Sequence, residues 1–202
     1  MTSCIKDTGN GIVFGNRHFS VTLDNNCRVV EIINLDTNEN VIDTEADRDF
    51  VYLKAHDKSK IAPVSVKADG DILKVAFENG LCADIKTEAF DSFITLELVS
   101  ELDESVWAIY FGNLYTTLKE IKDGDSYMLN SVGMTAWTNP QVVGYREPAP
   151  ESSAYACTVY DKSAKGAKLA LVFSKKRDAI PYLKDDCPYN LPEERTSPNI
   201  PR

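Results

Sequence analysis

The chain is poor in histidine and lacks the common motifs of nucleophilic, metal and nucleotide chemistry. Only His18 and His56 occur among its 202 residues, and neither is flanked by a nucleophile or a ligand pattern. HExxH, GxSxG, GxGxxG and GxxxxGK[ST] are all absent, which leaves metalloprotease, serine hydrolase and nucleotide-binding activities without support. We therefore expect both histidines on the surface and assign no catalytic residue.

Clusters of positive charge and long apolar runs are also missing. The chain carries 22 Lys and Arg against 31 Asp and Glu, which gives a net charge of −9. Binding to nucleic acid requires clustered basic residues, and a membrane-spanning helix requires about 20 apolar residues in succession. We therefore expect no nucleic-acid partner and no membrane span.

Five cysteines are present, but no CxxC pair brings two of them together, so we expect no zinc site and no cofactor. Cys82 and Cys157 fall inside apolar strand patterns and are expected to be buried thiols. The segment Asp123-Gly124-Asp125-Ser126 resembles part of a calcium loop but lacks its further acidic ligands. A plain turn is the favoured interpretation, with a structural ion shared with distant loops left open.

Short strands separated by turn residues are abundant. Asp69-Gly70-Asp71 and Glu78-Asn79-Gly80 have the composition of hairpin turns. The expected strands cover 18–23, 28–34, 50–54, 64–68, 72–77, 81–87, 92–98, 107–111, 155–160 and 168–173. Such spacing predicts an all-β fold, an antiparallel β-sandwich, in which the last two strands form a hairpin around the turn 161–166.

The C-terminal segment differs from the rest in composition. Residues 185–202 contain four prolines and few apolar residues, which favours an extended chain over a strand in a sheet. We expect a β-sandwich domain over residues 1–184 and a Pro-rich linker or strap over residues 185–202. A linker of this kind is often followed by another domain, and we expect a catalytic domain to follow it.

Aromatic and planar polar residues gather in the stretch Ser131 to Pro148. Sugars bind to flat rings combined with planar hydrogen-bonding groups. The candidate ligand-binding residues are Trp137, Asn139, Tyr145, Arg146 and Glu147. The alternative is that the aromatic side chains only anchor a long loop. Trp107 opens an apolar strand and is expected to pack in the core.

Two segments resemble a known family. GNRHFSVTLDNNCRVVEIINLDTNENVID (15–43) is similar to the opening hairpin of galactose-mutarotase-like supersandwich domains, and VWAIYFGNLYTTL (106–118) is similar to a strand midway through them. The resemblance implies an accessory domain like those of glycoside hydrolases and polysaccharide lyases. Aldose epimerases of this fold use two histidines and a glutamate, and neither His18 nor His56 has a matching context.

The leading functional hypothesis is a non-catalytic accessory domain of a bacterial carbohydrate-active enzyme, which docks a catalytic domain and contacts glycan. The alternatives are a self-contained sugar-acting enzyme with paired carboxylates and a protein-binding surface module. Thr2-Ser3-Cys4 is interpreted as the remnant of a bacterial lipoprotein processing site. This predicts a secreted, periplasmic or cell-surface location.

Overall fold

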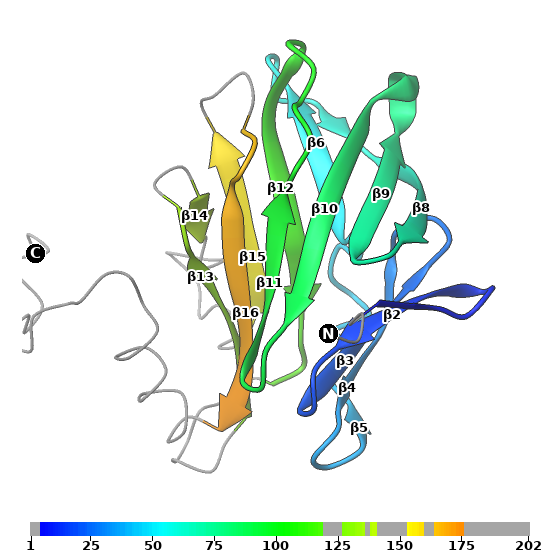
Figure 1. Ribbon diagram of the computed structural model, residues 1–202, viewed down its shortest axis with the longest axis vertical. Coiled ribbons are helices and arrows are strands. Elements are labelled where there is room, and N and C mark those ends of the chain that lie inside the picture. Colours follow the sequence, from blue (N-terminus) through cyan, green and yellow to red (C-terminus); the bar gives the residue numbers. More distant parts are fainter. Residues whose placement is uncertain (1–4, 119–126, 136–137, 141–152, 160–163, 176–202) are drawn as a thin grey trace, which may run out of the picture.

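The structure of the chain, a computed structural model, describes residues 5–118, 127–135, 138–140, 153–159 and 164–175 (Figure 1). Within these ranges the chain forms strands β1 to β16 and one 3-10 turn, η1 (Glu78–Gly80). All the strands pair antiparallel in three sheets, which confirms the expected all-β antiparallel fold. No helix in the described ranges is long and apolar enough to cross a membrane.

The N-terminal residues form a five-stranded sheet in which each strand pairs with the next along the chain. It lies at one end of the molecule, in blue in Figure 1. Its strands are β1 (Ile5–Asp7), β2 (Gly11–Gly15), β3 (Phe19–Asp24), β4 (Val29–Asn34) and β5 (Glu39–Asn40). In β3 the buried residues alternate with half-buried ones, as expected for a strand that covers a core with one face.

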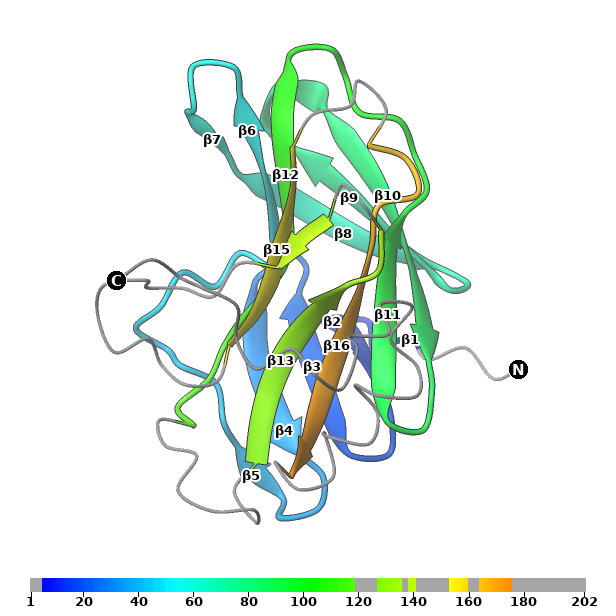
Figure 2. The same cartoon turned by 90° about the vertical axis from the view of Figure 1, so that its left-hand side faces the viewer.

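The remaining strands form the two layers of a sandwich, which are seen side by side in Figure 2. The six-stranded sheet has the order β13-β16-β11-β10-β9-β8, and the other five-stranded sheet has the order β14-β15-β12-β6-β7. The first contains β8 (Pro63–Asp69), β9 (Ile72–Phe77), β10 (Cys82–Ala89), β11 (Phe93–Leu98), β13 (Tyr127–Gly133) and β16 (Lys168–Lys175). The second contains β6 (Val51–Ala55), β7 (Lys60–Ile61), β12 (Val106–Tyr115), β14 (Thr138–Pro140) and β15 (Ser153–Val159).

One hydrophobic core joins all three sheets. Phe14 of the N-terminal sheet packs its ring 5.3 Å from that of Phe50, and Phe19 packs 5.4 Å from Phe173 of β16. These rings are almost completely buried. The N-terminal sheet therefore closes one end of the sandwich and does not form a core of its own.

Two expectations about local structure were wrong. The last two expected strands do not form a hairpin, because β15 pairs with β12 and β14 whereas β16 pairs with β11 and β13 in the opposite layer. Cys82 is exposed, because the residues of β10 that face the core are Ala83, Ile85 and Thr87. Alternation does not specify the partner strand of β15 or β16. For Cys82 it does indicate the exposed face, because it places Cys82 on the same side of β10 as Asp84 and Lys86.

The turns were predicted well. Asp69-Gly70-Asp71 joins β8 and β9, with Gly70 at a φ of 64°. Glu78-Asn79-Gly80 forms η1 between β9 and β10, with Asn79 and Gly80 both at positive φ. The Pro-rich segment 185–202 and the boundary before it lie outside the described residues.

Candidate functional site

Most of the predicted ligand-binding stretch lies outside the part of the chain that the structure describes. This applies to Trp137, Tyr145, Arg146 and Glu147. The backbone of Asn139 is described in β14, where it pairs with Cys157 of β15. Cys157 in turn pairs with Tyr110 of β12, and Tyr110 pairs with Tyr52 of β6. Positions 139, 157, 110 and 52 thus form one row across four strands of the five-stranded sheet.

The outer face of this sheet carries a stacked tyrosine pair. Residues 109 and 111 of β12 point into the main core, so Ala108 and Tyr110 point away from it and form a smaller cluster of their own. The rings of Tyr52 and Tyr110 are 4.8 Å apart and inclined by only 6°. Lys54 lies over the Tyr110 ring at 4.9 Å, and Lys60 over the Tyr52 ring at 4.8 Å. Each ring of the stacked pair therefore has a lysine ammonium group within cation–π distance, a contact that the quadrupole of an aromatic ring favours.

Trp107 belongs to this outer cluster and not to the main core, which corrects the expectation from the sequence. The pairing of β12 with β6 shifts between Val106 and Ala108, so Trp107 is the extra residue of a β-bulge. A bulge turns a side chain that strict alternation would direct inward. The ammonium group of Lys58, in the turn between β6 and β7, lies over the Trp107 ring.

We call the set Tyr52, Lys54, Lys58, Trp107 and Tyr110 the aromatic-lysine face. Its rings come from two neighbouring strands, and its ammonium groups come from β6 and from the turn that follows β6. Tyr52, Lys54 and Trp107 are half-buried and Lys58 is exposed, whereas Tyr110 is buried, with 8% of its surface exposed. The half-buried rings of Tyr52 and Trp107 thus lie beside hydrogen-bond donors. The sequence analysis predicted such a combination for the stretch 131–148 and missed this one. Only the strand pairing brings these residues together.

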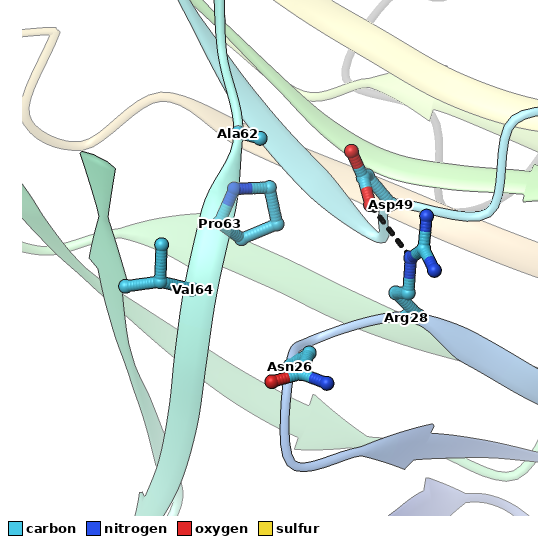
Figure 3. A pocket seen from close by; sticks show the side chains of 6 residues that line it. All are labelled: Asn26, Arg28, Asp49, Ala62, Pro63 and Val64. Carbon is cyan, nitrogen blue, oxygen red and sulfur yellow. Dashed lines mark hydrogen bonds and ion pairs between the residues drawn. The ribbon is translucent and has the colours of Figure 1, made fainter.

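A hollow of about 320 Å³ lies where the N-terminal sheet meets β8 (Figure 3). It is lined by Asn26, Arg28, Asp49, Ala62, Pro63 and Val64. The dashed line in Figure 3 joins Nε of Arg28 to Oδ1 of Asp49, which are 3.5 Å apart. The Asp49 side chain is only 11% exposed, whereas that of Arg28 is 56% exposed. At this hollow the Arg28 guanidinium group is therefore exposed to solvent beside the largely buried Asp49 carboxylate.

Lys60 links this hollow to the aromatic-lysine face. Its Nζ is 2.9 Å from Oδ2 of Asp49, it also binds Asp47, and it lies over the Tyr52 ring. Partial burial alone would lower the pKa of Lys60, but hydrogen bonds to the two carboxylates outweigh this effect and raise it. Lys60 is thus a charged, fixed connection between the two regions.

A pair of carboxylates lies on the six-stranded sheet, and the hypothesis of a self-contained enzyme requires such a pair. Nζ of Lys168 is 3.2 Å from Oε2 of Glu88 and 3.2 Å from Oε2 of Glu97. Hydrogen bonds from Lys86 and Lys168 hold the pKa of Glu88 below its ordinary value. A glycosidase acid needs a raised pKa and an open gap for the sugar between its carboxyl groups. Here Lys168 fills that gap, so the pair acts as an ion-pair network.

Both histidines lie at the surface, as expected. His18 Nδ1 is 3.3 Å from Oδ2 of Asp36, and Nε2 of His56 is 3.1 Å from the carbonyl oxygen of Glu104. Within the described ranges no group of three His, Cys, Asp or Glu residues is placed to hold a metal ion. The calcium-loop-like segment Asp123 to Ser126 falls outside those ranges.

No protein-family model and no curated protein matches the chain. Among solved structures, the chain is similar to a 4-alpha-glucanotransferase from Thermococcus litoralis, with 10% identity and a TM-score of 0.38. The likeness covers 84% of this chain and 38% of that enzyme's chain. So distant a likeness carries no inference about activity, and the resemblance to galactose-mutarotase-like domains stays a prediction.

Proposed function

We propose that the chain is a non-catalytic β-sandwich module that binds carbohydrate on the aromatic-lysine face. The carrying observation is the position of the half-buried Tyr52 and Trp107 rings on the outer face of one sheet, beside the buried Tyr110 and with lysine ammonium groups among them. Aromatic rings pack against the C–H surfaces of sugars, and ammonium groups donate hydrogen bonds to their oxygens. The blocked carboxylate pair on the other sheet favours binding over catalysis.

The stretch 131–148 is proposed as an extension of the same site. Position 139 shares a row of the sheet with Tyr110 and Tyr52, and β14 is the edge strand of that sheet. A ligand that spans the row would pass from the tyrosine pair to this edge. The proposed contacts there are Trp137, Asn139, Tyr145, Arg146 and Glu147.

The parent protein that we propose is a bacterial carbohydrate-active enzyme, either a glycoside hydrolase or a lyase. In this proposal the module is secreted, periplasmic or attached to the cell surface, and it docks a catalytic domain. These points rest on the resemblance to galactose-mutarotase-like domains and on the proline-rich composition of residues 185–202. The carbohydrate-binding proposal is independent of them, because it rests on the aromatic-lysine face.

Affinity gel electrophoresis against a panel of soluble polysaccharides tests the proposal. We expect at least one polysaccharide to retard the wild-type protein and Trp107→Ala to weaken that binding about tenfold or more, as for buried aromatic anchors elsewhere. Phe90→Ala is the matched control, because Phe90 is 46% exposed in the turn between β10 and β11 of the other layer. An unchanged melting temperature shows that each variant is folded.

The proposal fails if no polysaccharide retards the wild-type protein, or if Trp107→Ala binds as well as Phe90→Ala. Trp137→Ala in the same gels tests the extension separately. Weakened binding supports a site that reaches the β14 edge. Unchanged binding restricts the site to the aromatic-lysine face and favours the alternative in which Trp137 anchors its loop.

A further inference from the structure

The aromatic-lysine face concentrates positive charge on a protein whose net charge is −9. Lys54 and Lys60 occupy directly paired positions on β6 and β7, and Lys58 lies in the turn that joins these strands. Like charges directly opposite each other on a sheet are destabilising. Lys60 is compensated by Asp47 and Asp49. Lys54 and Lys58 have no such carboxylate partner among the described residues.

Lys54 and Lys58 form no ion pair with any carboxylate of the described residues. Their ammonium groups lie over the rings of Tyr110 and Trp107 instead. Desolvation lowers the pKa of Lys58, and the nearby charge of Lys54 lowers it further. Two cations that influence each other without an intervening anion form a site that a bound anion would stabilise.

The turn that carries Lys58 holds it in an unfavourable backbone conformation. The Lys58 amide donates to the carbonyl oxygen of Ala55 at 2.9 Å, and Lys58 has a φ of 71°. Glycine or asparagine adopts this left-handed conformation at lower cost. Asp57 accepts hydrogen bonds from both the amide and the hydroxyl of Ser59. The turn is therefore fixed in the shape that places the lysine beside Trp107.

We infer that the carbohydrate bound by this face is acidic, with a uronic-acid carboxylate received between Lys54 and Lys58. This inference rests on the proposed function and names its ligand class. A bound anion complements the charge of the two ammonium groups, and a ligand with flat C–H surfaces beside that anion complements the neighbouring rings. A uronic acid combines both in one pyranose ring. An acidic peptide supplies the carboxylates without the flat C–H surface.

Isothermal titration with a panel of oligouronates and their methyl esters tests the inference, because esterification removes the charge and keeps the sugar ring. We expect the wild-type protein to prefer the acid about tenfold at low salt, and the preference to shrink as salt screens the lysines. The double variant Lys54→Gln/Lys58→Gln should lose this preference and bind the acid no more tightly than the ester. Lys67→Gln, an exposed lysine on β8, is the matched control and should retain the preference.

The other outcomes separate the two proposals. Equal affinity of the wild-type protein for acid and ester would overturn the inference and leave carbohydrate binding intact. Binding of poly-glutamate as tight as that of the oligouronate would also overturn it, because the face would then select charge without the sugar. Binding of neither acid nor ester, together with no retardation by any polysaccharide, would overturn the proposed function itself.

Discussion

Replacing Asp49 by asparagine should destabilise the junction between the N-terminal sheet and the aromatic-lysine face. The substitution keeps the size of the side chain and removes its charge. Asp49 contacts Arg28 at 3.5 Å and Lys60 at 2.9 Å, and its own backbone carbonyl accepts a buried hydrogen bond from Asn113. The last bond does not depend on the side chain, so the variant isolates the effect of the charge.

The expected decrease in the free energy of unfolding of Asp49→Asn lies between two limits. Removing one partner of a fully buried ion pair costs about 3–5 kcal/mol, whereas an exposed pair contributes about 0–1 kcal/mol. The Asp49 side chain is 11% exposed, but those of Lys60 and Arg28 are 37% and 56% exposed, so solvent compensates both cations when the carboxylate is lost. We therefore expect the free energy of unfolding to fall by about 1–2 kcal/mol.

Urea denaturation followed by circular dichroism measures this change. With a slope of about 2 kcal/mol per molar urea, the midpoint should fall by about 0.5–1 M. Asp69→Asn is the control, because Asp69 pairs with Lys74 in an exposed turn where the side chains are 66% and 50% exposed, and its midpoint should shift much less. A double-mutant cycle with Lys60→Gln should give a coupling of about 0.5–1 kcal/mol. A coupling of zero, or equal shifts for Asp49→Asn and Asp69→Asn, would refute the reasoning.

Three further predictions test the fold and its charges. Gly11→Ala should lower the free energy of unfolding by about 2 kcal/mol or more, because a Cβ atom at this position meets the carbonyl oxygen of Leu23 across the β2–β3 pair. An unchanged melting temperature of the variant would contradict this close approach. Glu88 has a lowered pKa in the folded state. The stability that it contributes relative to Glu88→Gln should therefore be present at a pH above 4.5, the ordinary pKa of the group, and should be lost as the pH falls through the folded-state pKa. Urea denaturation of both proteins at several pH values checks this, and a difference in stability that persists at pH 2 would contradict it. In the native protein Cys82 should react with iodoacetamide because it is exposed. Cys27 should not react, because it is fully buried and burial raises the pKa of its thiol. Peptide mapping by mass spectrometry checks both cysteines, and an unmodified Cys82 would contradict the assignment of the β10 faces.

The carboxylate network on the six-stranded sheet shows how far composition alone can mislead. An acidic chain with 31 carboxylates is compatible with a sugar-cleaving pair. Only the register of β11 with β16 shows that Lys168 lies between Glu88 and Glu97. No spacing in the sequence relates positions 88, 97 and 168, because three separate strands contribute them.

The sequence by itself determined the local structure, that is, the strands and the turns. Alternation of apolar and polar residues and turns such as Asp69-Gly70-Asp71 specified strands and hairpins, because side chains of a strand alternate with a period of two and left-handed turn positions favour Gly, Asn and Asp. The choice of partner strand was decided only by the tertiary structure. A strand such as β15 has the same pattern whether it pairs with β16 or crosses to β12. The aromatic-lysine face is decided by the tertiary structure, because a bulge turns Trp107 outward and the pairing of β6 with β12 stacks Tyr52 on Tyr110.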